Sequence, residues 1–374
     1  MKLLEYSKQD IKNPKIYYIL LLLFLWLCCS SHDGPYRYTS FSRLTHPEEY
    51  AYMLDDLPDD VIGICEIAEQ QTVHRNLLPY FCIPREKWEE MNLIWPRGES
   101  IPDISIMLKA LQKTYPHTLY TYRAVENRLI GACMTESIFL SGLIRYKNIP
   151  ARIRAGYFRD TMANANHVIS FWEENLRGRG IREDLLEENP DEWKKLMNDI
   201  TRREQIEVNK RIEHWVCEYW DYTEKKWRIL DANTTFLKVS SDIDVGYHLP
   251  LKHFQFAYQA WKIMRKSDNF NPDQYAEYPH DGRTHIRSQL LLDFYCLLNH
   301  DMAGFDDQSG PISDFVKRKS FEEVSSEELN ELDALAELLS KEPSVEDLTN
   351  FYYSSKTLQI ESAEKDPHSF VYRK

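Results

Sequence analysis

Apolar positions in the chain follow helical spacing up to about residue 145 and strand spacing directly after it. In residues 131–148, GACMTESIFLSGLIRYKN, they cover a wide face, which predicts a buried helix that begins near Cys133. Residues 149–158, IPARIRAGYF, alternate and predict a strand. Upstream, Pro47 and Pro58 punctuate the pattern, so we expect mainly helices before this strand.

Residues 213–233, EHWVCEYWDYTEKKWRILDAN, have the aromatic and β-branched content of two strands joined by a polar turn around Asp221 to Lys226. In an antiparallel hairpin the beginning of the first strand lies opposite the end of the second. The pattern therefore predicts that the side chains of His214 and Asp231 lie close enough to touch.

Two helices are expected after the hairpin. The first, FAYQAWKIMR, should place Trp261 in the core, and the second should begin with a capping box from Ser325 to Glu328 and stop before Pro343. The core-facing residues of the second helix are expected to be Leu332, Leu335 and Leu339. We expect its acidic residues to be solvated.

The N-terminus carries an uninterrupted apolar run, IYYILLLLFLWLCC, at residues 16–29, with lysines before it. The length of the run suits a signal-peptide core better than a full membrane span. Residues 1–31 are therefore expected to be a signal or membrane-anchor segment, with lipidation at Cys28 or Cys29 as one form of it, and the following domain exported or anchored outside the cytoplasm. A buried core helix in a cytoplasmic protein is the alternative.

Charge and cysteine usage exclude several classes of function. Lys and Arg total 46 against 59 for Asp and Glu, and the net charge of -13 opposes attraction to phosphate backbones, so nucleic acid is not an expected partner. The seven cysteines form no C-x-x-C pair, which argues against a zinc ribbon or a dense disulfide framework.

Cys133 is the candidate nucleophile. A thiol in the first turn of a helix lies near the positive end of the helix dipole, which lowers its pKa, and an imidazolium at His214 would lower it further. Asp231 would fix the tautomer of His214 and favour its protonated form. N–H groups at the helix start could hold an oxyanion. Together these residues predict acyl transfer with Cys133, His214 and Asp231 as the catalytic residues, without a metal or cofactor.

A second histidine competes for the role of base. HVISFWEE, which begins at His167, echoes HWVCEYWD, and Asp184 lies as far beyond His167 as Asp231 lies beyond His214. The residues after His167 lack the aromatic and β-branched composition of a second strand, so we favour His214 as the base. The echo lies beside a charged tract at about residues 173–210, which is expected to be a helical insertion, either a solvated excursion or a lid.

These motifs resemble the transglutaminase-like superfamily. The resemblance rests on Gly131 and Cys133, NIPARIRAGY at 148–157, HWVCEYWD at 214–221 and WRILDAN at 227–233. It covers about residues 45–360 and implies one transglutaminase-like domain of the α+β class. Its papain-like core would pack the cysteine helix on an antiparallel sheet, with additional helices. Asn148 replaces the usual glycine of G-I-P-A-R and can still adopt a left-handed conformation.

The resemblance implies acyl transfer from a peptide or protein amide, and export favours hydrolysis because water is abundant. Two alternatives remain open. One is an inactive cell-envelope binding or scaffold protein that keeps the fold. The other alternative is a zinc site formed by Cys133, His214, Asp231 and Cys217. It is disfavoured because Cys217 lies three residues from His214 on a strand and therefore points to the opposite face. The oligomeric state is not predicted.

Overall fold

The computed structural model describes residues 34–78, 81, 83, 92–93, 103–158, 211–241, 244–275, 281–299 and 320–358. The expected signal or anchor segment at 1–31, the insertion at 173–210 and the competing His167 all lie outside these residues. In the described ranges, no helix has the length and apolar character needed to cross a membrane.

The centre of the fold is a four-stranded antiparallel sheet in the order β6-β5-β4-β7. Its strands are β4 (Ala151–Phe158), β5 (Glu213–Asp221), β6 (Lys226–Leu230) and β7 (Phe254–Phe256). The predicted strand and hairpin are therefore confirmed. The turn between β5 and β6 is closed by the Asp221 side chain, which accepts the backbone N–H groups of Thr223 and Glu224.

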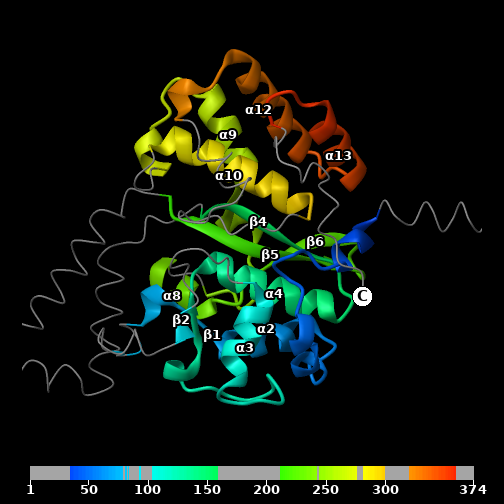
Figure 1. Ribbon diagram of the computed structural model, residues 1–374. Helices are drawn as coiled ribbons and strands as arrows, with labels where there is room; N and C mark the ends of the chain where they lie inside the picture. Colours follow the sequence, from blue (N-terminus) through cyan, green and yellow to red (C-terminus); the bar gives the residue numbers. More distant parts are fainter. Residues whose placement is uncertain are drawn as a thin grey trace, which may run out of the picture.

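Helices lie on both sides of this sheet (Figure 1). On one side are α9 (Ala257–Lys266), α10 (Gly282–Leu297), α12 (Ser326–Leu339) and α13 (Val345–Ser354). On the other side are α2 (Val61–Gln71), α3 (Ile104–Gln112), α4 (Cys133–Tyr146) and α8 (Thr234–Ser241). This mixture of helices with an antiparallel sheet confirms the α+β class.

A second, small sheet was not expected from the sequence. It is parallel, in the order β1-β3-β2, with β1 (Thr72–His74), β2 (Asn92–Leu93) and β3 (Leu129–Gly131). The expectation of mainly helices in this region is confirmed, but these three strands were missed because strands of two or three residues are too short to show an alternating pattern. The remaining elements are short 3₁₀ helices: η3 (Pro35–Thr39), η4 (Glu48–Leu54), η5 (Arg75–Leu77), η7 (Val125–Asn127), η8 (Leu251–His253), η9 (Pro272–Tyr275) and η10 (Phe321–Glu323).

Helix α4 begins at Cys133, as predicted, and follows β3 after a single residue. The Thr135 hydroxyl accepts the N–H of Ala132 and donates to its carbonyl, both at 2.8 Å. A Cβ on Gly131 would overlap this hydroxyl, so glycine is required for the close approach. At the other end, Asn148 has φ 59°, and the predicted left-handed turn into β4 is confirmed.

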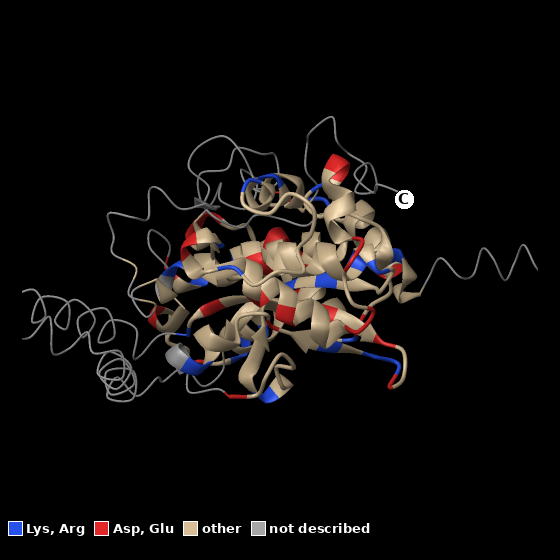
Figure 2. Ribbon diagram, turned by 90° about the horizontal axis from the view of Figure 1, so that it is seen from below, with Lys and Arg blue, Asp and Glu red and all other residues tan. Residues whose placement is uncertain are grey.

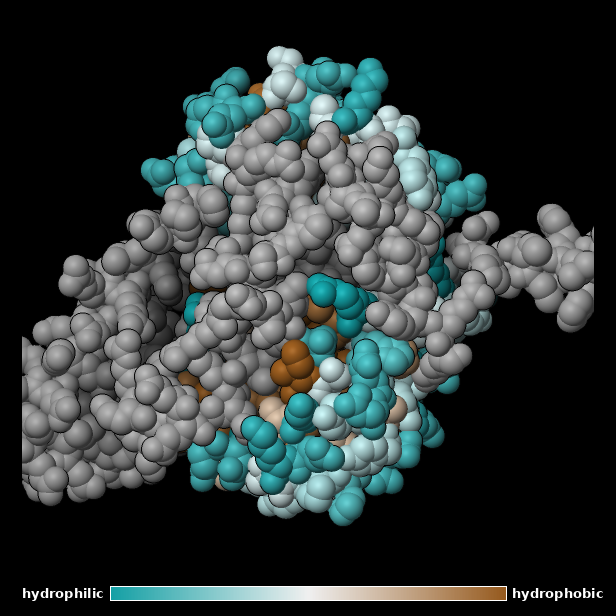
Figure 3. All heavy atoms as spheres, in the orientation of Figure 1, coloured by the Kyte–Doolittle hydropathy of each residue, from teal (hydrophilic) through white to brown (hydrophobic). Residues whose placement is uncertain are grey.

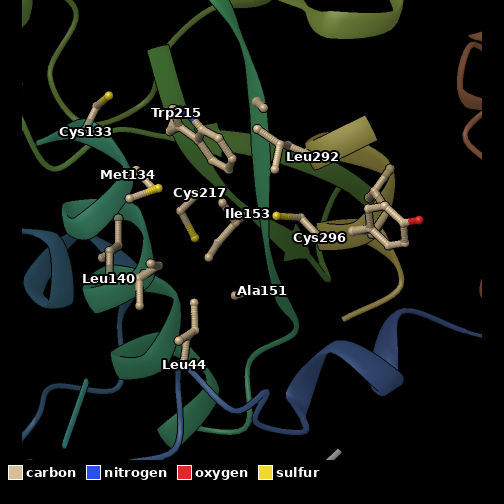
Figure 4. Close-up of a cluster of buried hydrophobic side chains, with 14 of the residues drawn as sticks. Leu44, Cys133, Met134, Leu140, Ala151, Ile153, Trp215, Cys217, Leu292 and Cys296 are labelled. Atoms are coloured by element: carbon tan, nitrogen blue, oxygen red, sulfur yellow. The ribbon is translucent and has the colours of Figure 1, made fainter. Parts of the chain in front are cut away.

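The core is formed where α4 and α10 pack on the central sheet. Figure 4 shows Met134 and Leu140 of α4, Ile153 and Cys217 of the sheet, and Leu292 and Cys296 of α10 in one buried cluster. Trp261 is fully buried, and Leu332, Leu335 and Leu339 of α12 are at most 3% exposed, as predicted. On the described surface, acidic and basic residues are interspersed with uncharged ones (Figure 2), and a small group of apolar residues shows near the centre of the face in Figure 3.

The expectation that the acidic residues of α12 are solvated is wrong for Glu328, which is buried, whereas Glu331 and Asp333 stay partly exposed and also accept hydrogen bonds. Glu328 is 2% exposed and accepts from Arg287 at 2.5 Å. Asp333 accepts from the Trp261 indole at 2.8 Å. Burial raises the pKa of Glu331, but hydrogen bonds from side chains and backbone after α13 outweigh it and lower the pKa to about 2. These carboxylates therefore fasten α12 to its neighbours, because each finds a donor at close range.

Candidate active site

Cys133 stands at the junction of α4 with the central sheet. Its side chain is 8% exposed and points away from the buried cluster of Figure 4. Strand β6 ends at Leu230, which pairs with Cys217, so β6 does not reach the beginning of β5. There the backbone N–H of Trp215 lies close enough to the Cys133 sulfur to lower the pKa of the thiol. The sulfur thus lies next to the strand position that follows His214.

His214 and Asp231 are hydrogen-bonded to each other, which confirms the contact predicted from the hairpin. The bond joins Nε2 of the imidazole to Oδ2 of the carboxylate, and the two side chains are only 1% and 6% exposed. The other carboxylate oxygen accepts the backbone N–H of Asn233 at 2.8 Å. Both oxygens of Asp231 therefore have donors, which fixes the carboxylate relative to the imidazole.

The second ring nitrogen of His214 is available. Its Nδ1 is buried and has no hydrogen-bond partner in the described part of the chain. His285 provides a contrast, because its Nε2 binds Glu213 and its Nδ1 binds the carbonyl of Tyr275, both at 2.9 Å. Of these two buried histidines that pair with a carboxylate, only His214 keeps a free nitrogen for proton transfer.

Aromatic packing fixes the plane of the His214 ring. Phe158 stacks on it with centroids 4.1 Å apart and an angle of 24° between the rings. Gly156 pairs with His214 across β4 and β5, and a Cβ there would overlap the carbonyl of Gln255 and the ring of Phe254. Close packing at this end of the sheet therefore depends on the glycine.

The expected low pKa of Cys133 is not found. Burial raises the pKa of the thiol well above its usual value, the charge of Glu213 raises it further, and the N–H of Trp215 lowers it only in part. Within the described residues, no hydrogen bond joins the sulfur to His214. The resting site therefore holds a neutral thiol rather than a thiolate and imidazolium pair, because a buried charge without a close counter-charge is costly.

Glu136 and Asn233 belong to the site, and the sequence analysis missed both. Glu136 follows Cys133 by three residues on α4 and accepts from Nδ2 of Asn233 at 2.6 Å. Burial raises the pKa of Glu136 to about 8, assisted by the charge of Asp231 and opposed by the Asn233 hydrogen bond. The sequence feature that could have identified Glu136 is a carboxylic acid inside an otherwise apolar, buried helical stretch. A buried carboxyl group needs a hydrogen-bond partner, so its presence there indicates a specific contact.

His74 of β1 is a further imidazole at the site. It is 5% exposed and stacks on Phe236 at 4.2 Å, and Phe236 also lies parallel to the His214 ring at 6.2 Å. Burial lowers the pKa of His74 to about 3, and the charge of His214 contributes. His74 is therefore neutral over the physiological range and does not compete for the proton of Cys133.

Backbone groups at the start of α4 complete the arrangement. The N–H of Ala132 is already bonded to Thr135, whereas the N–H of Cys133, in the first turn, has no acceptor within the helix. It is the group best placed to stabilise an oxyanion.

The four residues considered as a zinc site do not form a metal-binding arrangement. Among the described residues, no group of three or more His, Cys, Asp or Glu side chains has an arrangement that could hold a metal ion. Cys217 packs in the apolar cluster of Figure 4, and alternation along β5 places it on the opposite face from His214.

No protein-family model matches the chain, and neither the curated proteins nor the solved structures include a significant match. The chemistry of the site is therefore inferred from its own side chains.

Proposed function

We propose that this protein is a thiol-dependent acyl-transfer enzyme of the transglutaminase-like type, with Cys133 as nucleophile, His214 as base and Asp231 as the group that orients the base. The observation that carries the proposal is the bond from Nε2 of His214 to Asp231, which leaves Nδ1 of the same imidazole without a partner among the described residues. The next residue along β5 is Trp215, whose backbone N–H lowers the pKa of the Cys133 thiol. An imidazole fixed in this way is prepared to take a proton.

In the proposed reaction the thiol loses its proton during the attack, since it is neutral at rest. The Cys133 sulfur forms a bond to the amide carbonyl carbon while its proton moves to Nδ1 of His214, and the N–H of Cys133 stabilises the oxyanion. The C–N bond then breaks, the amine leaves with the proton from His214, and a thioester remains. Water, deprotonated by His214, attacks the thioester and releases the acid and the thiol.

The substrate class we propose is a peptide or protein amide, with water as acceptor. The cysteine helix α4 packed on the antiparallel sheet supports a papain-like core. Export or membrane anchoring through residues 1–31 is part of the proposal and is supported by the apolar run with its preceding lysines.

An inactive binding or scaffold protein is the second candidate, and two observations favour it. The Cys133 thiol is buried and neutral. In addition, two cavities on the described residues include none of Cys133, His214 and Asp231. In this case the three side chains would serve only packing.

Acylation by p-nitrophenyl acetate separates the two functions. We expect p-nitrophenol release and an acetyl group on Cys133, identified by mass mapping, while Cys65, Cys217 and Cys296, which are fully buried, stay unmodified. His214→Ala should slow acylation by at least about 100-fold and Asp231→Asn by a smaller factor, because general-base catalysis contributes roughly this much.

His285→Gln is the matched control, because it also removes a buried histidine from a carboxylate pair. It should lower the melting temperature and leave the acylation rate per folded molecule unchanged. Acylation of Cys133 at equal rates in wild type and His214→Ala would refute the catalytic proposal and favour the scaffold.

A further inference from the structure

A cavity of about 310 Å³ lies against the central sheet, and its lining includes none of Cys133, His214 and Asp231. Residues from all four strands, from η8 and α9, and from the ends of α10 and α12 line it, among them Arg152, Trp227, Leu251, Lys252, Leu297 and Leu339. Its walls thus combine leucine and aromatic side chains with the buried charges of Arg152, Arg154 and Glu218.

The guanidinium of Arg152 is held in a fixed plane. The side chain is 6% exposed, and Nε donates to Glu218 at 2.7 Å. Its central carbon lies 3.9 Å from the ring centroid of Trp227 and 5.7 Å from that of Tyr38. A stacked and tethered guanidinium has little freedom left to lose when it binds a ligand.

Only some of the hydrogen-bond donors of Arg152 nevertheless have an acceptor among the described residues. Its neighbour Arg154, two residues along the same face of β4, binds Asp293 through Nε and Nη2 and Glu218 through Nη1. For Arg152, the bond from Nε to Glu218 leaves the N–H donors of the two terminal nitrogens without a partner among the described residues. These donors border the cavity. A buried cation with spare N–H groups beside an open space favours an acceptor in that space.

The other charges near the cavity balance one another. The buried cations Arg152 and Arg154 face the buried anions Glu218 and Asp293. At the rim, exposed Lys252 opposes exposed Glu342. The cavity would therefore bind an anion through the directed N–H donors of Arg152 rather than through an excess of positive charge. Such paired donors favour a planar acceptor with two oxygen atoms.

We propose that this cavity is a binding site for a carboxylate carried on a small apolar body. The carboxylate would accept from the terminal nitrogens of Arg152, and the apolar part would lie against Leu251, Leu297 and Leu339. A volume of this size is at the lower end for small-molecule sites and accommodates a short acyl amino acid. The site shares no residue with Cys133, His214 and Asp231, so it stands independently of the proposed acyl transfer.

Calorimetric titration with N-acetyl-L-leucine and with N-acetyl-L-leucinamide tests the site, because the two compounds differ only in the carboxylate. We expect the acid to bind with a Kd on the order of 1 mM, and the amide at least about tenfold more weakly, the loss expected for one charge-assisted bond. Equal binding of the two, or no heat from the acid at about 20 mM, would overturn the proposal.

Three variants locate the binding. Arg152→Lys keeps the charge beside Glu218 but loses the planar fork, and should weaken binding of the acid about tenfold. Leu251→Trp should do the same by filling the mouth, and since Leu251 is 63% exposed it should not disturb folding. Arg228→Met, on β6 outside the cavity lining, is the matched control and should bind as wild type does.

Unchanged affinity in both Arg152→Lys and Leu251→Trp would refute the cavity as the binding site. Cys133→Ser should retain wild-type affinity, whether or not the acyl-transfer proposal holds. Loss of binding in Cys133→Ser would instead place the ligand at the candidate active site and overturn the inference.

Discussion

Replacing Glu136 by glutamine should make the folding stability of the protein less dependent on pH. In the folded chain, burial and the charge of Asp231 raise the pKa of this carboxyl to about 8. In the unfolded chain it returns to about 4.3. Between these values the folded state holds a proton that the unfolded state has lost. The stability that this proton confers is fully present below about pH 4.3 and is lost as pH rises through 8.

The size of the effect follows from the separation of the two pKa values. It is roughly 3.5 pH units, and at about 1.4 kcal/mol per unit the loss reaches on the order of 5 kcal/mol. Glutamine has the same shape, does not titrate and keeps an oxygen for the N–H of Asn233. The free energy of unfolding of Glu136→Gln relative to wild type should therefore rise with pH, by up to about 5 kcal/mol from pH 4.5 to 9.

Urea unfolding at closely spaced pH values measures this difference, and Glu331→Gln is the matched control. The pKa of Glu331 is lowered to about 2, so this carboxyl is ionised in both states above about pH 6. Its variant should differ from wild type by a constant amount over pH 6 to 9. If Glu136→Gln also differs by a constant amount in this range, the carboxyl is ionised in the folded state and the reasoning fails.

Two further variants test how the site is held. Asn233→Ala removes both the donor to Glu136 and the acceptor for the N–H of Phe236 at the start of α8. It should lower the free energy of unfolding, measured by urea titration, by about 2–4 kcal/mol. A loss below about 0.5 kcal/mol would contradict these contacts. Gly131→Ala should displace the Thr135 hydroxyl and shift the start of α4. Acylation of Cys133 should therefore slow by at least about tenfold, while the far-ultraviolet circular dichroism spectrum stays as in wild type. An unchanged acylation rate would show that the helix start tolerates the methyl group.

The sequence predicted the parts of the site that depend on local pattern. Helix α4 begins at Cys133 because an apolar helical face starts there, and His214 meets Asp231 because hairpin pairing follows from strand and turn content. The left-handed turn at Asn148 was likewise predictable from residue type.

The parts that depend on tertiary packing were not predictable. The neutral state of Cys133 arises from burial and from Glu213, whose position beside the thiol is set by packing. The pairing of Glu136 with Asn233 joins residues 97 positions apart, and Glu328 meets Arg287 across 41 positions. The periodicity of one segment does not show which distant donor will form a hydrogen bond with a carboxylate in that segment.

The unequal length of the hairpin strands has a consequence for the Cys133 thiol. Because β6 stops at Leu230 while β5 continues back to Glu213, Trp215 pairs with Ala155 of β4 but with no residue of β6, and its N–H acts on the Cys133 sulfur instead. The main chain, rather than a side chain, thus supplies this contribution to the pKa of the thiol. Exchange of the Trp215 side chain leaves this N–H in place, and among the amino acids only proline, which has no N–H, removes it.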